Sequence, residues 1–212
     1  MSPVAYHHGS LRPALLARAE VALREVGVEG LSLRQIARNI GVSHGAPARH
    51  FRDKQALLDA LALNGFESMN GQLAAAAGGD GSFRERFEAT ARAYVSFATQ
   101  HAELLQVMYA TKHHESASEL LRETGSAGMT ITQELIAAAQ LAGEVRSGDP
   151  GVLAVVLLAQ VHGLAVLAVG DLLDGHDLDT ALAASLDLLW RGLERRDLPG
   201  EERSGRSRRT TA

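Results

Sequence analysis

Apolar side chains recur along this chain at helical spacing, and no segment shows the strict alternation and β-branched enrichment of a strand. The first apolar stripe consists of Leu15, Ala19, Ala22 and Val26. Ser10 precedes this stripe as a capping residue, and Gly27 and Gly30 end it. The pattern predicts a helix over about 11–26 and an all-α fold.

Two short helical patterns follow, separated by a glycine turn. Ser32 and Gln35 have the spacing of a capping box, which predicts a helix that begins at Ser32 and ends near Gly41. Ser43 caps a second, shorter pattern that runs to about residue 51. Asp53 then caps a long helix that extends to the alanines at 74–77.

The break at 78–81 (Gly-Gly-Asp-Gly) is the best candidate for a flexible connection. A phosphate-binding loop is the competing interpretation, but no strand precedes it and no Lys-Ser/Thr pair follows. Ser82 and Glu85 form a new capping box, and Pro150 stands at a helix start behind Asp149. Further helices are predicted over about 83–98, 103–110, 116–141, 151–173 and 178–193.

The segment 151–170 is almost wholly apolar and close to membrane-spanning length. Gln160 and His162 stand at its centre, where a polar group in lipid is costly. We therefore interpret it as a helix buried in a subunit interface, with no membrane as partner. This helix and the last one carry more apolar surface than one subunit of this size can cover. We expect a four-helix interface between two subunits to bury Leu157, Leu164, Leu186 and Leu193.

Charge is unevenly distributed over the 212 residues. Residues 1–60 hold eight Lys/Arg against five Asp/Glu, whereas the remainder holds 13 against 20, and the whole chain has a formal charge of −4. A basic amino-terminal unit joined to an acidic body is expected when one part meets phosphate. The chain has no cysteine, which excludes disulfides, thiolate metal sites and a cysteine nucleophile, and this fits a reducing cytoplasm.

The two short helices around the turn at Gly41 fit the helix-turn-helix pattern, here about residues 32–52. In that motif the start of the second helix meets base edges in the major groove. Gly45 is a poor helix former and Ala46 has a small side chain, so both allow the backbone to approach the bases closely. Arg49 and His50 would then lie near phosphates. His50 could equally be a packing residue beside Phe51.

These residues also resemble a known family, the TetR-type transcriptional regulators. The matching stretches are Leu31-Ser32-Leu33-Arg34-Gln35-Ile36-Ala37, Gly41-Val42-Ser43, His50-Phe51 and Lys54-Gln55-Ala56-Leu57-Leu58. The resemblance implies a three-helix helix-turn-helix domain joined through a fourth helix to a helical ligand-binding and dimerisation domain. We expect the DNA-binding domain over 1–60, the effector and dimerisation domain over 61–198, and a disordered basic tail over 199–212.

The resemblance also implies roles for single residues. Arg34 would reach a guanine edge, although a solvated helix residue is the alternative, and Ser32 would cap its helix and touch phosphate. The base-facing residues would be His44, Gly45 and Ala46, and the phosphate contacts His50 and Lys54. At position 48 this chain has alanine where the family usually has tyrosine.

An effector pocket would need aromatic and apolar side chains with a few polar groups. The candidates are Tyr94, Phe97, Met108, Tyr109, Gln160 and His162. Three further histidines, His101, His113 and His114, lack the spacing of a metal site, so we expect no metal and no cofactor. Nucleotide, hydrolase and zinc-protease motifs are absent from the sequence, which argues against an enzyme.

We therefore expect a cytoplasmic, homodimeric transcriptional regulator, most simply a repressor that a small apolar effector releases from DNA. Two recognition helices would enter successive major grooves of a pseudo-palindromic operator in double-stranded DNA. Two other hypotheses remain: a DNA-binding architectural protein without an effector and, more distantly, a helical enzyme.

Overall fold

The structure is a computed structural model and describes residues 11–194. These residues form eight α-helices and one short 3-10 helix, and among them no strand is present beyond an isolated bridge between Val145 and Glu194. The predicted all-α fold is therefore confirmed. The capping residue Ser10 and the predicted tail 199–212 lie outside the described residues.

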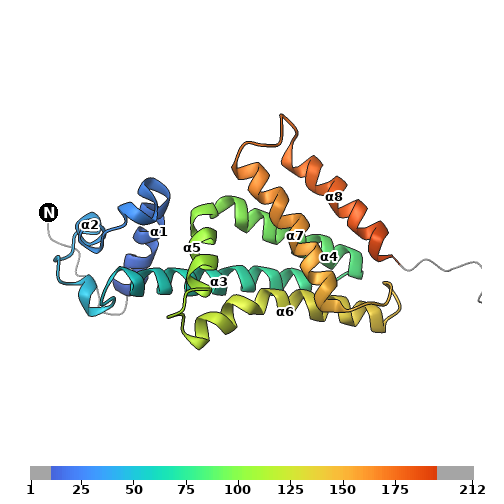
Figure 1. The fold of residues 1–212 in the computed structure, drawn as a ribbon, viewed down its shortest axis with the longest axis horizontal. Coiled ribbons are helices and arrows are strands. Elements are labelled where there is room, and N and C mark those ends of the chain that lie inside the picture. The colour runs from blue at the N-terminus through green and yellow to red at the C-terminus, as the bar shows by residue number, and fades with distance from the viewer. Residues whose placement is uncertain (1–10, 195–212) are drawn as a thin grey trace, which may run out of the picture.

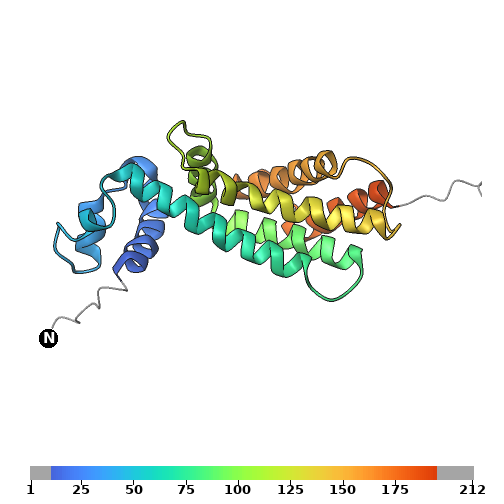
Figure 2. The same cartoon turned by 90° about the horizontal axis from the view of Figure 1, so that it is seen from below.

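The elements are α1 (Leu11–Gly30), α2 (Leu33–Asn39), η1 (Pro47–Arg49), α3 (Lys54–Ala77), α4 (Phe83–Gln100), α5 (Ala102–Lys112), α6 (Glu119–Leu141), α7 (Pro150–Val169) and α8 (Leu178–Leu193). Helices α1 and α2 form a small unit at one end, and α3 runs from this unit along the length of the body (Figures 1 and 2). In the body α3 packs against α4, α5 and α6, while α7 packs against α4, α6 and α8.

Three helix starts are set by the capping residues that the sequence indicates. The side chain of Asp53 accepts the backbone N–H of Ala56 at 2.8 Å, and that of Asp149 accepts Gly151 N–H at 2.7 Å. At α4, Ser82 and Glu85 form both hydrogen bonds of a capping box. These predictions are confirmed, and each cap satisfies backbone N–H groups that a helix start leaves without partners.

The end of α1 departs from the prediction. Gly27 has a left-handed φ of 67°, so the helix is kinked there and then continues to Gly30. Val26 was expected in the buried stripe but is 55% exposed, because its side chain lies over Gly30 at the kink. A β-carbon on Gly30 would be only 2.7 Å from Cβ of Val26.

One continuous apolar core joins the small unit to the body. In the small unit Leu15 and Leu23 of α1, Ile36 of α2 and Leu57 of α3 are almost fully buried. Phe66, further along α3, is fully buried in the body. Because α3 is unbroken across residue 60, the expected boundary between the two domains stays a prediction.

Candidate functional site

The turn after α2 is a closed C-terminal cap. Gly41 has a φ of 73°, its N–H donates to the carbonyl of Arg38 at 3.1 Å, and Val42 N–H donates to Ala37 at 3.0 Å. These two bonds are those of a Schellman motif, which needs a left-handed residue and therefore favours glycine at position 41. The turn directs the chain sharply away from α2, as a helix-turn-helix requires.

The segment after the turn is not the α-helix that the sequence predicted. It consists of turns and the 3-10 helix η1, with Ala46 N–H donating to Ser43 at 2.9 Å and Phe51 N–H to Pro47 at 2.8 Å. Pro47 has no N–H with which to bond the carbonyl of Ser43, so a regular helical turn cannot form across it. The helix predicted from Ser43 is therefore wrong, although a helical turn remains at 47–49.

The residues that the sequence assigned to DNA lie at the end of the molecule remote from α8 (Figure 1). The exposed ones are Ser32, Arg34, His44, Gly45 and Arg49, and the partly buried ones are Ala46, His50 and Lys54. Phe51 holds this segment in place, since its ring is almost fully buried and the Arg12 guanidinium lies 5.6 Å from the ring centroid. The structure therefore presents one contiguous segment with Arg34 and Arg49 exposed.

Two side chains in this segment have roles that the sequence did not indicate. Ser32 is the N-cap of α2 but makes no side-chain capping bond, and the side-chain amide of Gln35 pairs instead with that of Asn39 at 2.8 Å. The predicted capping box is therefore wrong, because an i,i+4 amide pair takes the Gln35 side chain. Lys54 Nζ donates to the backbone carbonyl of Glu29 at 3.3 Å, which joins the start of α3 to the end of α1.

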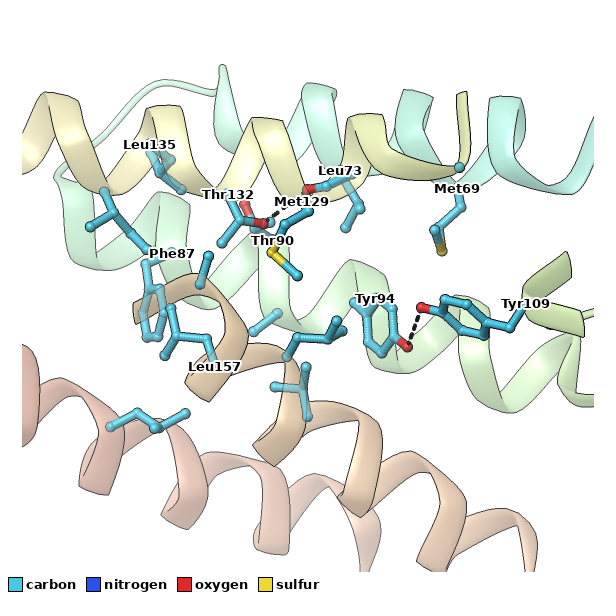
Figure 3. Close-up of a pocket in the computed structure, with 18 of the residues that line it drawn as sticks. Met69, Leu73, Phe87, Thr90, Tyr94, Tyr109, Met129, Thr132, Leu135 and Leu157 are labelled. Carbon is cyan, nitrogen blue, oxygen red and sulfur yellow. Dashed lines mark hydrogen bonds between the residues drawn. The ribbon is translucent and has the colours of Figure 1, made fainter. Parts of the chain in front are cut away.

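A largely apolar cavity of about 120 Å³ lies in the body between α3, α4, α6 and α7 (Figure 3). Apolar side chains make most of its wall, including Met69, Leu73, Phe87, Met129, Leu135, Ile136, Leu157 and Leu189. Two threonines also line it, but Thr90 Oγ1 donates to the carbonyl of Arg86 at 2.8 Å and Thr132 Oγ1 to that of Gly128 at 3.1 Å. Both threonine hydroxyls therefore donate their hydrogens within their own helices and not into the cavity.

A partly buried polar cluster stands at one side of the cavity. The Tyr94 hydroxyl lies 3.3 Å from that of Tyr109 and 2.8 Å from Nδ1 of His162. Burial raises the pKa of Tyr94 well above its ordinary value, and the neighbouring Tyr109 adds to the shift. Tyr94 therefore stays a neutral hydroxyl at physiological pH and can donate only one of its two hydrogen bonds. Figure 3 shows Tyr94 and Tyr109 pointing toward one another.

Lys112 is the one charged residue among the described residues of the cavity wall. It was not among the pocket candidates from the sequence, because a lysine in the last turn of a helix is typical of a solvated surface. Its Nζ donates to the backbone carbonyl of Gly125 in α6 at 2.7 Å. Burial lowers the pKa of Lys112, since the ammonium loses part of its hydration.

The six pocket candidates do not come together at one place. Tyr94 and Tyr109 line the cavity, and His162 is bonded to Tyr94. Phe97 is buried and stacks on His101 with ring centroids 4.8 Å apart. Met108 is fully buried in the core against Gly65, and Gln160 donates to Ser185 at 2.8 Å between α7 and α8. Phe97, Met108 and Gln160 are not among the residues that line the cavity.

Helix α7 carries apolar side chains on all its faces. The leucines assigned to a subunit interface mostly face inward: Leu157, Leu186 and Leu193 are buried within the subunit, and Leu164 is half-buried. That assignment is wrong because these side chains fill the core between α7, α8 and α4. The large apolar residues exposed on α7 and α8 are Val152, Val155, Val156, Val166, Leu167, Val169 and Leu188.

By length and composition alone, Pro150–Val169 is the one helix among residues 11–194 that could cross a membrane. Of the residues in its most apolar window, 28% are buried within the subunit. Within the same part of the chain, no group of three or more His, Asp or Glu side chains is placed to hold a metal ion.

Comparison with known proteins assigns the class. A helix-turn-helix unit on a helical body is the architecture that the structure describes. The family described as "Bacterial regulatory proteins, tetR family" matches residues 15–61, and that described as "Tetracyclin repressor-like, C-terminal domain" matches residues 87–193. The second match alone spans half of the chain. The chain belongs to the TetR family of DNA-binding transcriptional regulators.

The chain is also similar to individual curated proteins and to solved structures. Tetracycline repressor protein class A from transposon 1721 of Escherichia coli is 51% identical over 53 residues, 24% of this chain and 24% of that protein. The chain thus aligns with about a quarter of the length of the curated relatives it matches. A protein with unknown function from Rhodococcus sp. RHA1 is 49% identical, with a TM-score of 0.84, 91% of this chain covered and 100% of that chain.

More distant structures share the fold. A putative TetR-family transcriptional regulator from Mesorhizobium loti is 17% identical with a TM-score of 0.73, covering 89% of this chain and 100% of its own. At this identity the likeness concerns the arrangement of helices and carries no information on ligands.

Proposed function

We propose that this protein is a transcriptional repressor in the cytoplasm that binds a pseudo-palindromic operator as a homodimer and leaves it when a small, mainly apolar effector binds the body. The observation that carries the proposal is the set of exposed side chains within segment 32–50, Arg34 and Arg49 among them, at the end of the molecule remote from α8 and within the part that matches the TetR family. A cavity in the body favours a regulator with an effector over an architectural DNA-binding protein.

Arg34 and Arg49 are the groups on which DNA binding would depend most. Both side chains are exposed, and neither makes an ion pair with another of the described residues. A free guanidinium can bond two acceptors of a guanine or a phosphate at once. Arg34 would read a base from α2, whereas Arg49 and His50 would hold phosphates and set the register.

The exposed apolar residues of α7 and α8 support dimerisation. Val152, Val155, Val156 and Val166 recur at helical spacing on α7, and Leu188 of α8 is 70% exposed. A contiguous apolar surface of this kind marks an interface on a protein that works in water. Packing α7 and α8 of two subunits together would bury it and would place two DNA-binding units on one duplex.

Helix α5 is the element through which the cavity would act on the DNA-binding unit. Tyr109 and Lys112 of α5 line the cavity, and α5 also packs against α1. At the start of α5, His101 Nδ1 lies 2.7 Å from Oε1 of Glu20 in α1. A ligand that moves α5 would therefore move α1 and lower the affinity for DNA. Bound DNA must then lower the affinity for the ligand by the same factor.

The test begins with selection of a preferred duplex from random sequence DNA by the full protein. We expect a two-fold symmetric site with half-sites about one helical turn apart, bound about a thousandfold or more tightly than random DNA at the same salt concentration. A thermal-shift screen then supplies ligands, which should lower operator affinity. Equal affinity for selected and random DNA would contradict the proposal.

A further inference from the structure

We propose that the effector is a small organic carboxylate whose acid group is bound by Lys112 and whose apolar part occupies the cavity. This inference rests on the proposed function, because it assigns the chemical class of ligand to the cavity that the proposed function treats as the effector site.

The first support is the placement of a rare cation. The chain has 19 arginines and only two lysines, and one of the two lines a cavity whose wall is otherwise neutral. No carboxylate of residues 11–194 forms an ion pair with Lys112. Among residues 11–194 its one hydrogen bond goes to the neutral carbonyl of Gly125, so an ammonium with three donors has capacity left for a ligand.

The second support is the local packing that admits this lysine. A β-carbon on Gly125 would lie 2.7 Å from Cδ of Lys112 and 3.1 Å from the ring of Phe66. The glycine therefore leaves open the surface of α6 along which the lysine stem passes. Partial burial of an ammonium without an opposite charge is unfavourable, as the lowered pKa of Lys112 also indicates. A carboxylate ligand would remove this cost.

The third support is the character of the remaining wall. Away from Lys112 the cavity offers Phe87, Leu135, Leu157 and Leu189, which match an apolar ligand body. The hydroxyls of Thr90 and Thr132 donate to backbone carbonyls, so this part of the wall has little demand for a polar ligand group. On α5 Tyr109 stands one turn before Lys112 on the same face, and the other polar group near it, the Tyr94 hydroxyl of α4, is already bonded to Tyr109 and His162.

The volume limits the size of the ligand. A cavity of roughly 150 Å³ holds one benzene molecule, so the 120 Å³ found here limits the apolar part of the ligand to a ring or a short chain of about five or six carbons. Hexanoate and benzoate are therefore suitable probes. Hexanamide and benzamide have nearly the same shape but no charge, and they serve as matched neutral ligands.

The experiment is a calorimetric titration of the full protein with each acid and its amide near pH 7. We expect each acid to bind about ten- to a hundredfold more tightly than its amide, the ratio typical of a hydrogen bond to a charged group. Lys112→Met, which keeps an unbranched apolar stem, should remove this ratio and change the amide affinity by less than about threefold. Arg92→Met, which removes an exposed cation from α4, is the control and should retain the ratio.

A second measurement does not depend on a variant. The acid should lose affinity as the pH rises through the lowered pKa of Lys112, because the ammonium becomes neutral, whereas the amide should not. Lys112 faces no other charged group of the described cavity wall. The other titratable groups of that wall are Tyr109 of α5 and Tyr94 of α4, and burial raises the pKa of Tyr94. Acid and amide affinities that are equal at every pH would overturn the inference.

The outcomes separate this inference from the proposed function. If a neutral ligand binds and lowers operator affinity while the acids bind no better, the carboxylate class is wrong and the repressor function stands. If the acids bind through Lys112 but operator affinity is unchanged, the ligand class stands and the effector role is wrong. Failure of all four probes to bind would overturn the inference and leave the operator experiment to decide the function.

Discussion

Glu20 of α1 and His101, which immediately precedes α5, join the DNA-binding unit to the body through a hydrogen bond of 2.7 Å between Oε1 and Nδ1. The contact is partly shielded, with 22% and 29% of the two side chains exposed. His101 also stacks on the buried Phe97, so its ring is fixed by the body. A movement of α5 therefore reaches α1 at a defined point.

Replacing Glu20 should weaken communication more than stability. Glu20→Ala should cost about 0.2–1 kcal/mol of the free energy of unfolding, since water still reaches this partly shielded contact. It should reduce the coupling between effector and operator by about 0.5–2 kcal/mol. Operator titrations with and without ligand measure this coupling. The control Glu25→Ala removes an ion pair within α1 and should leave this coupling unchanged. An equal loss of coupling in both variants would contradict the role of Glu20.

Arg34 should determine preference at one base position. Arg34→Ala is expected to cost about 1–3 kcal/mol on the selected operator and to relax selection at a single base pair. Because Arg34 is exposed and forms no ion pair within residues 11–194, folding stability should not change. Repeating the DNA selection with the variant gives the answer, with Arg92→Ala in α4 as control. Unaltered base preference would show that Arg34 does not read a base.

Much of the helical framework was predictable because its signals are local. Asp53, Ser82 and Asp149 each bond backbone groups two or three residues away, so sequence spacing is enough to locate a helix start. The segment after Gly41 was harder, because Pro47 removes one backbone donor and converts an expected α-helix into turns and a 3-10 helix.

The interface and the cavity could not be derived from the sequence for a different reason. Since α7 is apolar on every side, no stripe distinguishes Leu157, which faces inward, from Val156, which faces outward. Lys112 resembles a surface residue until α6 is placed beside it. The glycines at 125 and 128, one turn apart on α6, lie where the helices approach closely: a β-carbon at Gly125 would meet Lys112 and Phe66.

The exposed face of α7 should be the dimer interface. Val156→Glu would bury an unpaired carboxylate there, at a cost of about 3 kcal/mol or more, and should raise the dimer dissociation constant at least about a hundredfold. Light scattering at micromolar concentration would then detect monomers that remain helical by circular dichroism. Val26→Glu, at a similarly exposed valine of α1, should remain dimeric. A wild-type monomer under these conditions would refute the interface.

The capping box at the start of α4 should contribute to acid sensitivity. The backbone N–H of Ser82, and then its hydroxyl, donate to the Glu85 carboxylate and lower its pKa. The stabilisation is therefore present above the pKa of Glu85 in the unfolded chain and is lost as the pH falls through the lower pKa of the folded protein. Chemical denaturation of Glu85→Gln should show a smaller loss of stability between pH 6 and pH 3 than wild type. Glu123→Gln, an exposed control in α6, should match wild type.

Ala48 lies in η1, between the buried Pro47 and the exposed Arg49, and its own side chain is exposed. A tyrosine at this position can therefore project outward without disturbing the core and can donate its hydroxyl to a DNA phosphate. Phosphate contacts position a protein without specifying sequence. Ala48→Tyr should then strengthen binding to operator and to random DNA by similar factors, about 0.5–1.5 kcal/mol per subunit.

The control for this substitution is Ala48→Phe, which adds the same ring without the donor and should give little or no gain. Because a neutral hydroxyl releases few counterions, the salt dependence of binding should hardly change in either variant. The alternative is that the turns around Pro47 direct position 48 away from the duplex. Gel-shift titrations with both DNAs distinguish the two geometries: a gain for tyrosine alone supports docking of η1 against the backbone, whereas unchanged affinity in both variants means that position 48 does not face DNA.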